Sequence, residues 1–185
     1  MKKFIAIMLI VLTSSMVGCA NEESFVEEYP TSNVIPAEGG TEFYISREVP
    51  WEDTVELELP EFPGVTFIRS ATGVKAIDQS GERLLFGGMP IWNIYFMDIT
   101  GNGLPDFVAT VSIGSGIVDT RVIVYDFAND KRYELSNRMV YDYALAMDDG
   151  TLIVIQTPWL IDGEQRIGEL AIMEGELIMV DRMVN

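Results

Sequence analysis

YALAMDDGTLIVIQT, residues 143–157, contains the clearest β-hairpin signal in the chain. Two apolar runs flank Asp149-Gly150, a pair that tolerates the positive φ of a two-residue hairpin turn. Residues 152–155 are apolar at four consecutive positions, which is typical of a strand with both faces buried. The segment therefore predicts an antiparallel hairpin whose second strand is central in its sheet.

The same pattern of short apolar or alternating runs extends over the chain from residue 41 onward. Turn residues at Gln79-Ser80-Gly81, Asn129-Asp130 and Glu174-Gly175 predict further hairpins. No window of helical length has a sustained 3.6-residue apolar repeat with caps. The expected strands are 42–46, 54–59, 65–70, 73–77, 83–86, 92–98, 107–113, 120–127, 132–135, 143–147, 151–157, 166–173 and 176–181. The sequence predicts an all-β fold of mostly antiparallel hairpins, arranged as a sandwich or a partial propeller-like stack.

The first 18 residues have the order of a secretory signal peptide. Two lysines precede an apolar run at 4–12, and small and polar residues follow it. This run is shorter than the roughly 20 apolar residues that a membrane-spanning helix needs. We therefore predict that residues 1–18 are a cleaved signal peptide.

The four residues that end this region, Met16-Val17-Gly18-Cys19, resemble the bacterial lipobox. The resemblance implies that Cys19 carries diacylglycerol and becomes the mature N-terminus, on the extracytoplasmic face of a membrane in the bacterial cell envelope. Cys19 is the one cysteine of the chain, and a lone cysteine in a secreted protein needs a special explanation. Lipid anchoring supplies that explanation. The alternative is an ordinary signal peptide with a chance cysteine.

Residues 20–40 contain five acidic residues, two prolines and two glycines, with little apolar periodicity. Together with Cys19 they predict a tether over 19–40, or else an acidic recruitment tail. Residues 41–185 are then a single β-rich domain, a size that builds a core without disulfides.

The chain is strongly acidic, with 12 Lys and Arg against 29 Asp and Glu and a formal charge of −17. Such a surface repels phosphate backbones and anionic lipid headgroups, so nucleic acid is excluded as a partner. There is no histidine, which removes histidine-based nucleophilic catalysis and histidine zinc sites. An enzyme is therefore disfavoured, and paired carboxylates acting on a glycan are the catalytic chemistry that remains.

DITGNGLPD, residues 98–106, places oxygen-bearing side chains at relative positions 1, 3, 5 and 9. These are the alternate positions from which a curled loop directs oxygen ligands toward calcium. The expected metal ligands are Asp98, Thr100, Asn102, the backbone carbonyl of Leu104, and Asp106. The alternative is a glycine-rich turn in which Asp and Asn side chains bind local backbone groups.

The loop resembles the calcium loops of FG-GAP and VCBS repeats, with Asp98, Gly103, Pro105 and Asp106 matching their pattern. The resemblance implies one weakly bound structural calcium and covers a hairpin rather than a whole propeller. A longer region, about 59–181, resembles an extracytoplasmic appendage of Gram-positive membrane metallopeptidases of the β-lactam sensor-transducer type. That resemblance implies a sensing or binding domain, because the HExxH and SxxK motifs of proteolysis and penicillin acylation are missing.

Tryptophans at 51, 92 and 159 allow two interpretations. Aromatic faces can stack on sugars, but aromatic residues on strands more often fill cores.

These features together predict a membrane-anchored lipoprotein that binds or senses an envelope protein or a glycan without catalysis. The alternative function is an envelope glycan hydrolase that uses paired carboxylates.

Overall fold

The computed structural model describes residues 43–45 and 53–182, all of which belong to one compact unit, 32–185. The predicted signal peptide and the whole predicted tether, 19–40, which includes Cys19, lie outside the described residues, as does Trp51. The part of the chain that is described includes no helix with the length and hydropathy of a membrane span.

The described residues contain thirteen strands, and each strand begins and ends within two residues of its expected bounds. Every pair of hydrogen-bonded strands is antiparallel. The strands are β1 (Phe43–Ile45), β2 (Thr54–Glu58), β3 (Thr66–Ser70), β4 (Gly73–Asp78), β5 (Gly81–Gly87), β6 (Ile91–Met97), β7 (Asp106–Ile113), β8 (Asp119–Asp126), β9 (Lys131–Leu135), β10 (Tyr141–Asp148), β11 (Thr151–Pro158), β12 (Arg166–Met173) and β13 (Glu176–Asp181). The all-β prediction is confirmed.

The hairpin turns have the backbone conformation that their residues predict. Asp149 and Gly150 have φ values of 47° and 78°, and Glu174 and Gly175 have 54° and 85°. Positive φ at both central residues matches the right-handed twist of the strands on either side. The β10–β11 and β12–β13 hairpins therefore close through two-residue turns.

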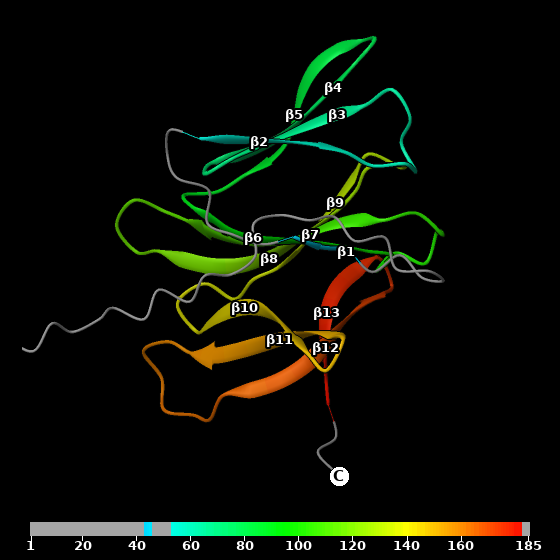
Figure 1. Cartoon of the computed structure of the whole chain (residues 1–185). Coiled ribbons are helices and arrows are strands. Elements are labelled where there is room, and N and C mark those ends of the chain that lie inside the picture. Colours follow the sequence, from blue (N-terminus) through cyan, green and yellow to red (C-terminus); the bar gives the residue numbers. More distant parts are fainter. Residues whose placement is uncertain (1–42, 46–52, 183–185) are drawn as a thin grey trace, which may run out of the picture. The chain divides into compact units, whose positions relative to one another are not determined.

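The strands form three stacked sheets (Figure 1). The central sheet has the order β1-β6-β7-β8-β9, and the other two have the orders β2-β3-β4-β5 and β10-β11-β12-β13. One apolar core joins the β2–β5 sheet to the central sheet, and a second joins the central sheet to the β10–β13 sheet. The fold is thus a sandwich with one sheet covered on both faces.

Strand β7 shows how one sequence serves two cores. Phe107 and Ala109 point into the first core and Val108 points into the second, because successive side chains alternate across a sheet. All but the last of its residues are buried. The apolar run 152–155 lies in β11, an inner strand of its sheet as expected, but its last residue, Ile155, is only partly buried.

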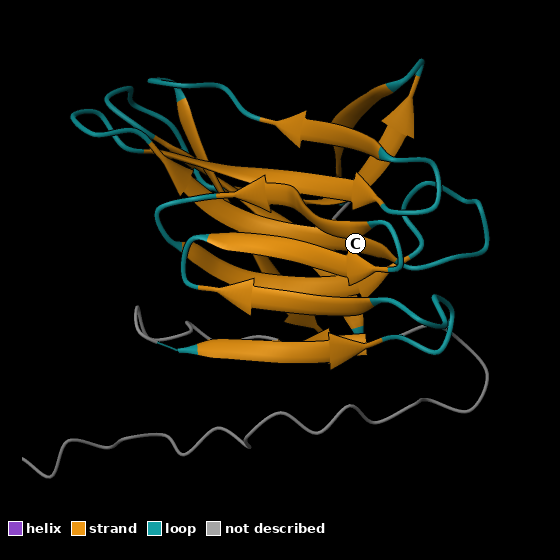
Figure 2. Cartoon of the chain, turned by 90° about the horizontal axis from the view of Figure 1, so that it is seen from above, coloured by secondary structure: helices purple, strands orange, loops and turns teal. Residues whose placement is uncertain are grey.

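Polar side chains of the central sheet hold the edge strand β10. Asn93 Nδ2 donates to the carbonyl of Leu145 at 3.0 Å, and the Leu145 amide donates to Thr110 Oγ1 at 3.0 Å. Asn93 Oδ1 also accepts from the Thr110 amide at 3.2 Å, beside a register shift between β6 and β7. These bonds satisfy backbone groups that a sheet edge otherwise leaves unpaired. Loops gather at the two ends of the strands (Figure 2).

Candidate binding surface

The loop 98–106 joins β6 to β7 at one end of the central sheet, and the carboxylate of Asp98 organises it. Its oxygens accept hydrogen bonds from the amides of Gly101, Asn102 and Gly103 at 2.7, 3.0 and 2.8 Å. Gly101 and Gly103 have φ values of 73° and 82°, a region that glycine enters without steric cost. The three amides wrap around one carboxylate.

The second carboxylate, that of Asp106, lies beneath the loop and is fully buried. It accepts from the amides of Ile99 and Thr100, both at 2.8 Å, and from Thr100 Oγ1 at 3.2 Å. Burial raises the pKa of Asp106 to about 6, the nearby charge of Asp126 adds to the rise, and the three hydrogen bonds oppose it.

The carboxylate oxygens expected to bind calcium therefore face amide donors of their own loop, and Thr100 Oγ1 donates to Asp106. Asn102 Oδ1 also accepts, from the Leu104 amide at 2.8 Å. The described residues contain no group of three or more acidic, histidine or cysteine side chains placed to hold a metal. A calcium ion here would have to share each carboxylate with three donors, and a carboxylate has about four lone-pair sites. The hydrogen bonds fit the turn interpretation, and calcium binding stays a prediction.

The opposite end of the sheets is apolar. The β5–β6, β7–β8, β9–β10 and β11–β12 connections lie there, on the left of Figure 1 for the last three. Six of the twelve exposed large apolar side chains in the described residues lie in these connections, and we group with them Trp92, near the start of β6. They are Met89, Trp92, Ile117, Val118, Met139, Leu160 and Ile161, and we call this set the apolar end.

Backbone contacts place these connections side by side. The Met89 amide donates to the Ser112 carbonyl at 2.6 Å, which ties the β5–β6 connection to β7. Arg138 Nη2 donates to the Ile117 carbonyl at 3.4 Å, which links the β9–β10 and β7–β8 connections. The Trp159 amide donates to the carbonyl of Val140 at 2.8 Å. These contacts tie the connections of the apolar end to one another and to β7.

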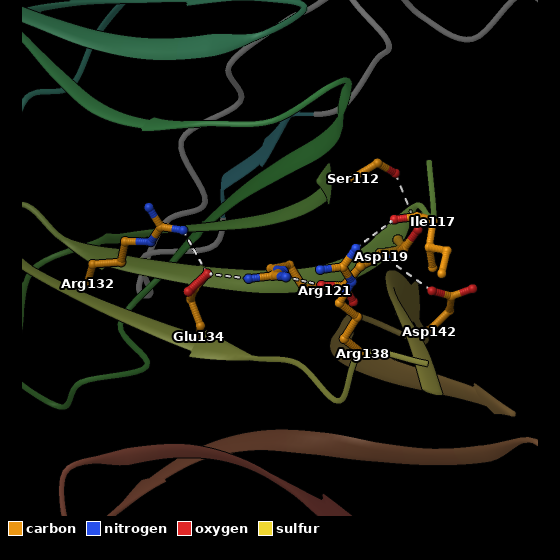
Figure 3. A network of polar contacts seen from close by, with 9 residues as sticks. Ser112, Ile117, Asp119, Arg121, Arg132, Glu134, Arg138 and Asp142 are labelled. Atoms are coloured by element: carbon orange, nitrogen blue, oxygen red, sulfur yellow. Dashed lines mark hydrogen bonds and ion pairs between the residues drawn. The ribbon is translucent and has the colours of Figure 1, made fainter. Parts of the chain in front are cut away.

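A row of polar contacts runs from Trp92 on β6 to Asp142 on β10, and Figure 3 draws its part from Ser112 to Asp142. Trp92 Nε1 donates to Ser112 Oγ at 2.8 Å, and Ser112 Oγ lies 3.3 Å from Thr120 Oγ1. The Thr120 amide donates to Asp142 Oδ1 at 3.0 Å. Trp92 is 43 % exposed, so its ring lies at the surface while its one polar atom is held. The row fixes the position of this ring.

An ion-pair chain continues from the same place along β8 and β9 (Figure 3). Arg121 pairs with the buried carboxylate of Asp119 and with Glu134 Oε1 at 3.0 Å, and Arg132 reaches Glu134 at 2.7 Å. Burial acts to raise the pKa of Glu134, but the hydrogen bonds and charges of Arg121 and Arg132 outweigh it and lower the pKa. Glu134 is thus held ionised.

Two residues of the apolar end have a backbone conformation that large side chains rarely adopt. Met139 and Leu160 have φ values of 68° and 55°. The other non-glycine residues with positive φ are all acidic, at 130, 149 and 174, and each belongs to a tight hairpin turn. Left-handed backbone costs about 1 kcal/mol or more outside glycine. The left-handed backbone at Met139 and Leu160 therefore lowers the stability of the fold, and the exposed side chains of these residues gain little burial in return.

The backbone conformation at Gly114, in the loop between β7 and β8, requires a glycine. The φ of Gly114 is 124°, and a Cβ there would lie 2.4 Å from the Ile117 carbonyl oxygen. Any other residue would therefore displace Ile117, which belongs to the apolar end.

A polar groove with a volume of about 430 Å³ lies between β9 and the β12–β13 turn. It is lined by Arg132, Tyr133, Glu134, Leu135, Ser136, Gly175, Glu176 and Leu177. Two of these residues, Glu134 and Glu176, are carboxylates, the residue type that a glycan hydrolase needs in a pair.

The chain matched no protein-family model, no curated protein and no solved structure. The resemblances to lipoproteins, FG-GAP loops and metallopeptidase appendages therefore stay predictions. The functional interpretation rests on the geometry.

Sequence reasoning located the 98–106 loop but did not single out the apolar end. Of the tryptophans, Trp92 is half-exposed at this end and Trp159 is partly buried beside it. A signal was present, because the connections at 136–140 and 159–165 contain Met139, Leu160 and Ile161, where polar residues are expected. Only the register of the strands shows that these connections meet.

Proposed function

We propose that the protein is a lipid-anchored, extracytoplasmic binding or sensing module that works without catalysis and engages its partner through the apolar end. The observation that carries this proposal is the gathering of seven exposed large apolar side chains on or beside adjoining connections. An exposed apolar surface of this kind marks interaction sites in soluble proteins. The net charge of −17 favours solubility, whereas an exposed apolar surface opposes it. This contrast supports a binding role for the apolar end.

The composition of the surface supports a macromolecular partner. Tryptophan, methionine and arginine are enriched at protein interfaces, and Trp92, Met139 and Arg138 are exposed at this end of the sheets. The polar row from Trp92 to Asp142 also ties together the strand ends from which these connections start, so binding would immobilise little of the strand framework.

Anchoring by Cys19 supports the same function, since a lipid-linked domain on a spacer can meet membrane or envelope components without diffusing away. In this proposal calcium, if bound at 98–106, would stabilise the opposite end of the central sheet and leave the apolar end unobstructed.

Site-specific photocrosslinking in living cells tests the proposal. A photoreactive phenylalanine analogue in place of Val118 or Ile161 should give a discrete adduct, because both side chains point out of the apolar end. The matched control is Leu84, which is also a large, exposed aliphatic residue but lies on β5. Equal yields of adduct at Leu84 and Ile161, or none at the apolar end, would contradict the proposal.

The groove between β9 and the β12–β13 turn favours the alternative, an envelope glycan hydrolase. Glu134, held ionised by two arginines, would serve as nucleophile or base, and Glu176 as the acid. This alternative predicts that the purified protein releases soluble fragments from envelope glycans, and that Glu134→Gln and Glu176→Gln each abolish the release. Intact glycan after incubation with the wild-type protein would eliminate it.

A further inference from the structure

We infer that the apolar end binds a second copy of this chain across a twofold axis, an inference that rests on the proposed function above. The charges around the apolar end identify this occupant. They are of both signs, and they have no partners within the described part of one copy.

Arg138 is the first of these charges. Five other exposed or partly exposed arginines lie within 4.0 Å of a carboxylate. Arg138 has no such ion pair among the described residues, and its one contact is the long bond to the Ile117 carbonyl (Figure 3). In a chain with 29 acidic residues, an exposed arginine without a carboxylate is available for one from outside.

The complementary charges lie on the neighbouring connection. Asp162 and Glu164 are exposed in the β11–β12 connection, directly after Leu160 and Ile161, and neither has an ion-pair partner in the described residues. A twofold interface brings one patch against itself, so a residue i that contacts j is matched by j contacting i. Arg138 of each copy would then face the acidic connection of the other, on both sides of an apolar centre.

The centre of this interface is formed by Met139, Leu160 and Ile161. Met139 and Leu160 are the two large residues with left-handed backbone, which holds their side chains outward before any partner arrives. Local strain of this kind persists where function requires it. The left-handed φ sets the direction of each Cα–Cβ bond, so association has the side-chain rotamers to order and not the backbone.

A second copy also fits better than a lipid surface. Asp162 and Glu164 would meet anionic headgroups at the same end as the apolar side chains, and like charges repel. A second copy presents an arginine there instead. Two copies tethered to one membrane would also meet at a raised effective concentration, so a modest intrinsic affinity would suffice.

The test uses the full-length chain in cells that express two differently tagged copies, with the photoreactive residue at Ile161. We expect an adduct that contains both tags. Arg138→Glu should lower its yield about fivefold or more, because two attractive pairs become repulsive contacts. Combining Arg138→Glu with Asp162→Arg and Glu164→Arg should restore the yield, since the charges are exchanged. Lys131→Glu makes the same charge change at the far end of β9 and should leave the yield unchanged.

The outcomes separate this inference from the proposed function. An adduct at Ile161 that contains one tag and another protein, or a lipid, overturns self-association and retains the apolar end as a binding surface. Absence of any adduct contradicts both. Failure of the exchanged charges to restore the two-tag adduct, in a variant that resists proteolysis like the wild type, overturns the twofold arrangement.

Discussion

Asp106 shows at the residue scale how a buried carboxylate makes stability depend on pH. An unperturbed aspartate has a pKa of about 3.9, whereas burial raises that of Asp106 to about 6. Between these values the folded protein holds a proton that the unfolded chain has released. The contribution of Asp106 to stability is therefore full below about pH 4 and is lost as the pH rises through 6.

Asp106→Asn should remove this dependence. The amide oxygen can accept from Ile99 and Thr100 as the carboxylate does, and the amide nitrogen can donate to Thr100 Oγ1. We expect the variant to be more stable than the wild type by about 1–2 kcal/mol at neutral pH, with the difference disappearing near pH 4. Urea unfolding in the presence of a chelator, repeated across this pH range, measures it. A difference that grows as the pH falls would contradict the assignment.

The backbone conformation of Leu160 also lowers the stability of the folded protein. Leu160→Gly should stabilise the protein by about 0.5–1 kcal/mol, since glycine adopts φ of 55° without strain and the lost side chain is 76 % exposed. The same change should weaken the photocrosslink at Ile161. Thermal unfolding checks the first expectation, with Leu84→Gly in β5 as a control that should destabilise. A loss of stability in Leu160→Gly would show that the side chain supports the fold.

At the scale of elements, a few side-chain hydrogen bonds add to the second apolar core in holding β10 against the central sheet. Thr110→Val keeps the size and shape of the side chain but leaves the Leu145 amide without its acceptor. An unpaired buried group costs about 1–3 kcal/mol, so we expect a loss of that size in denaturant unfolding. Thr54→Val on the exposed edge strand β2 should change stability by a few tenths. Equal effects of the two substitutions would mean that water replaces Thr110.

The elements also show what the sequence can and cannot predict. Turn pairs such as Asp149-Gly150 set local backbone conformation, so the strands and hairpins are readable from short windows. Pairing between distant segments cannot be predicted from a short window, because it depends on which side chains are buried together in the whole fold. The pairing of β1 with β6 and the covering of both faces of β7 are of this kind. The start of β10 at Tyr141 likewise follows from its pairing with Pro158.

The sequence of the loop 98–106 predicts either a metal site or a turn. The hydrogen bonds within the loop hold its conformation without a metal. If calcium binds, saturation at about 100 times the dissociation constant should stabilise the protein by about 2.7 kcal/mol. Asp98→Ala should then abolish the stabilisation by calcium, and magnesium should not replace it. Thermal unfolding with calcium, magnesium or chelator decides this. Equal losses in Asp98→Ala with and without calcium would leave the loop as a turn.

At the scale of the whole molecule, the proposed function depends on two features at a distance from each other in the sequence, the cysteine expected to carry the lipid anchor and the apolar end. The second could not be predicted because Met89, Val118, Met139 and Leu160 lie in four connections that only the register of the sheets brings together. The first is readable from a short window, because processing enzymes recognise a linear segment.

Cys19→Ala therefore tests the anchor without disturbing the folded sheets. Replacing the thiol removes the atom that would carry the lipid, so the variant should lose metabolic labelling by a fatty-acid analogue and leave the membrane fraction. Loss of the tether also dilutes the copies from a membrane surface into a volume, so the two-tag adduct at Ile161 should fall together with membrane association. Ser14→Ala, within the signal segment but outside the lipobox, is the control. Retention of both label and membrane association in Cys19→Ala would mean that the cysteine is incidental and that another segment holds the protein at the membrane.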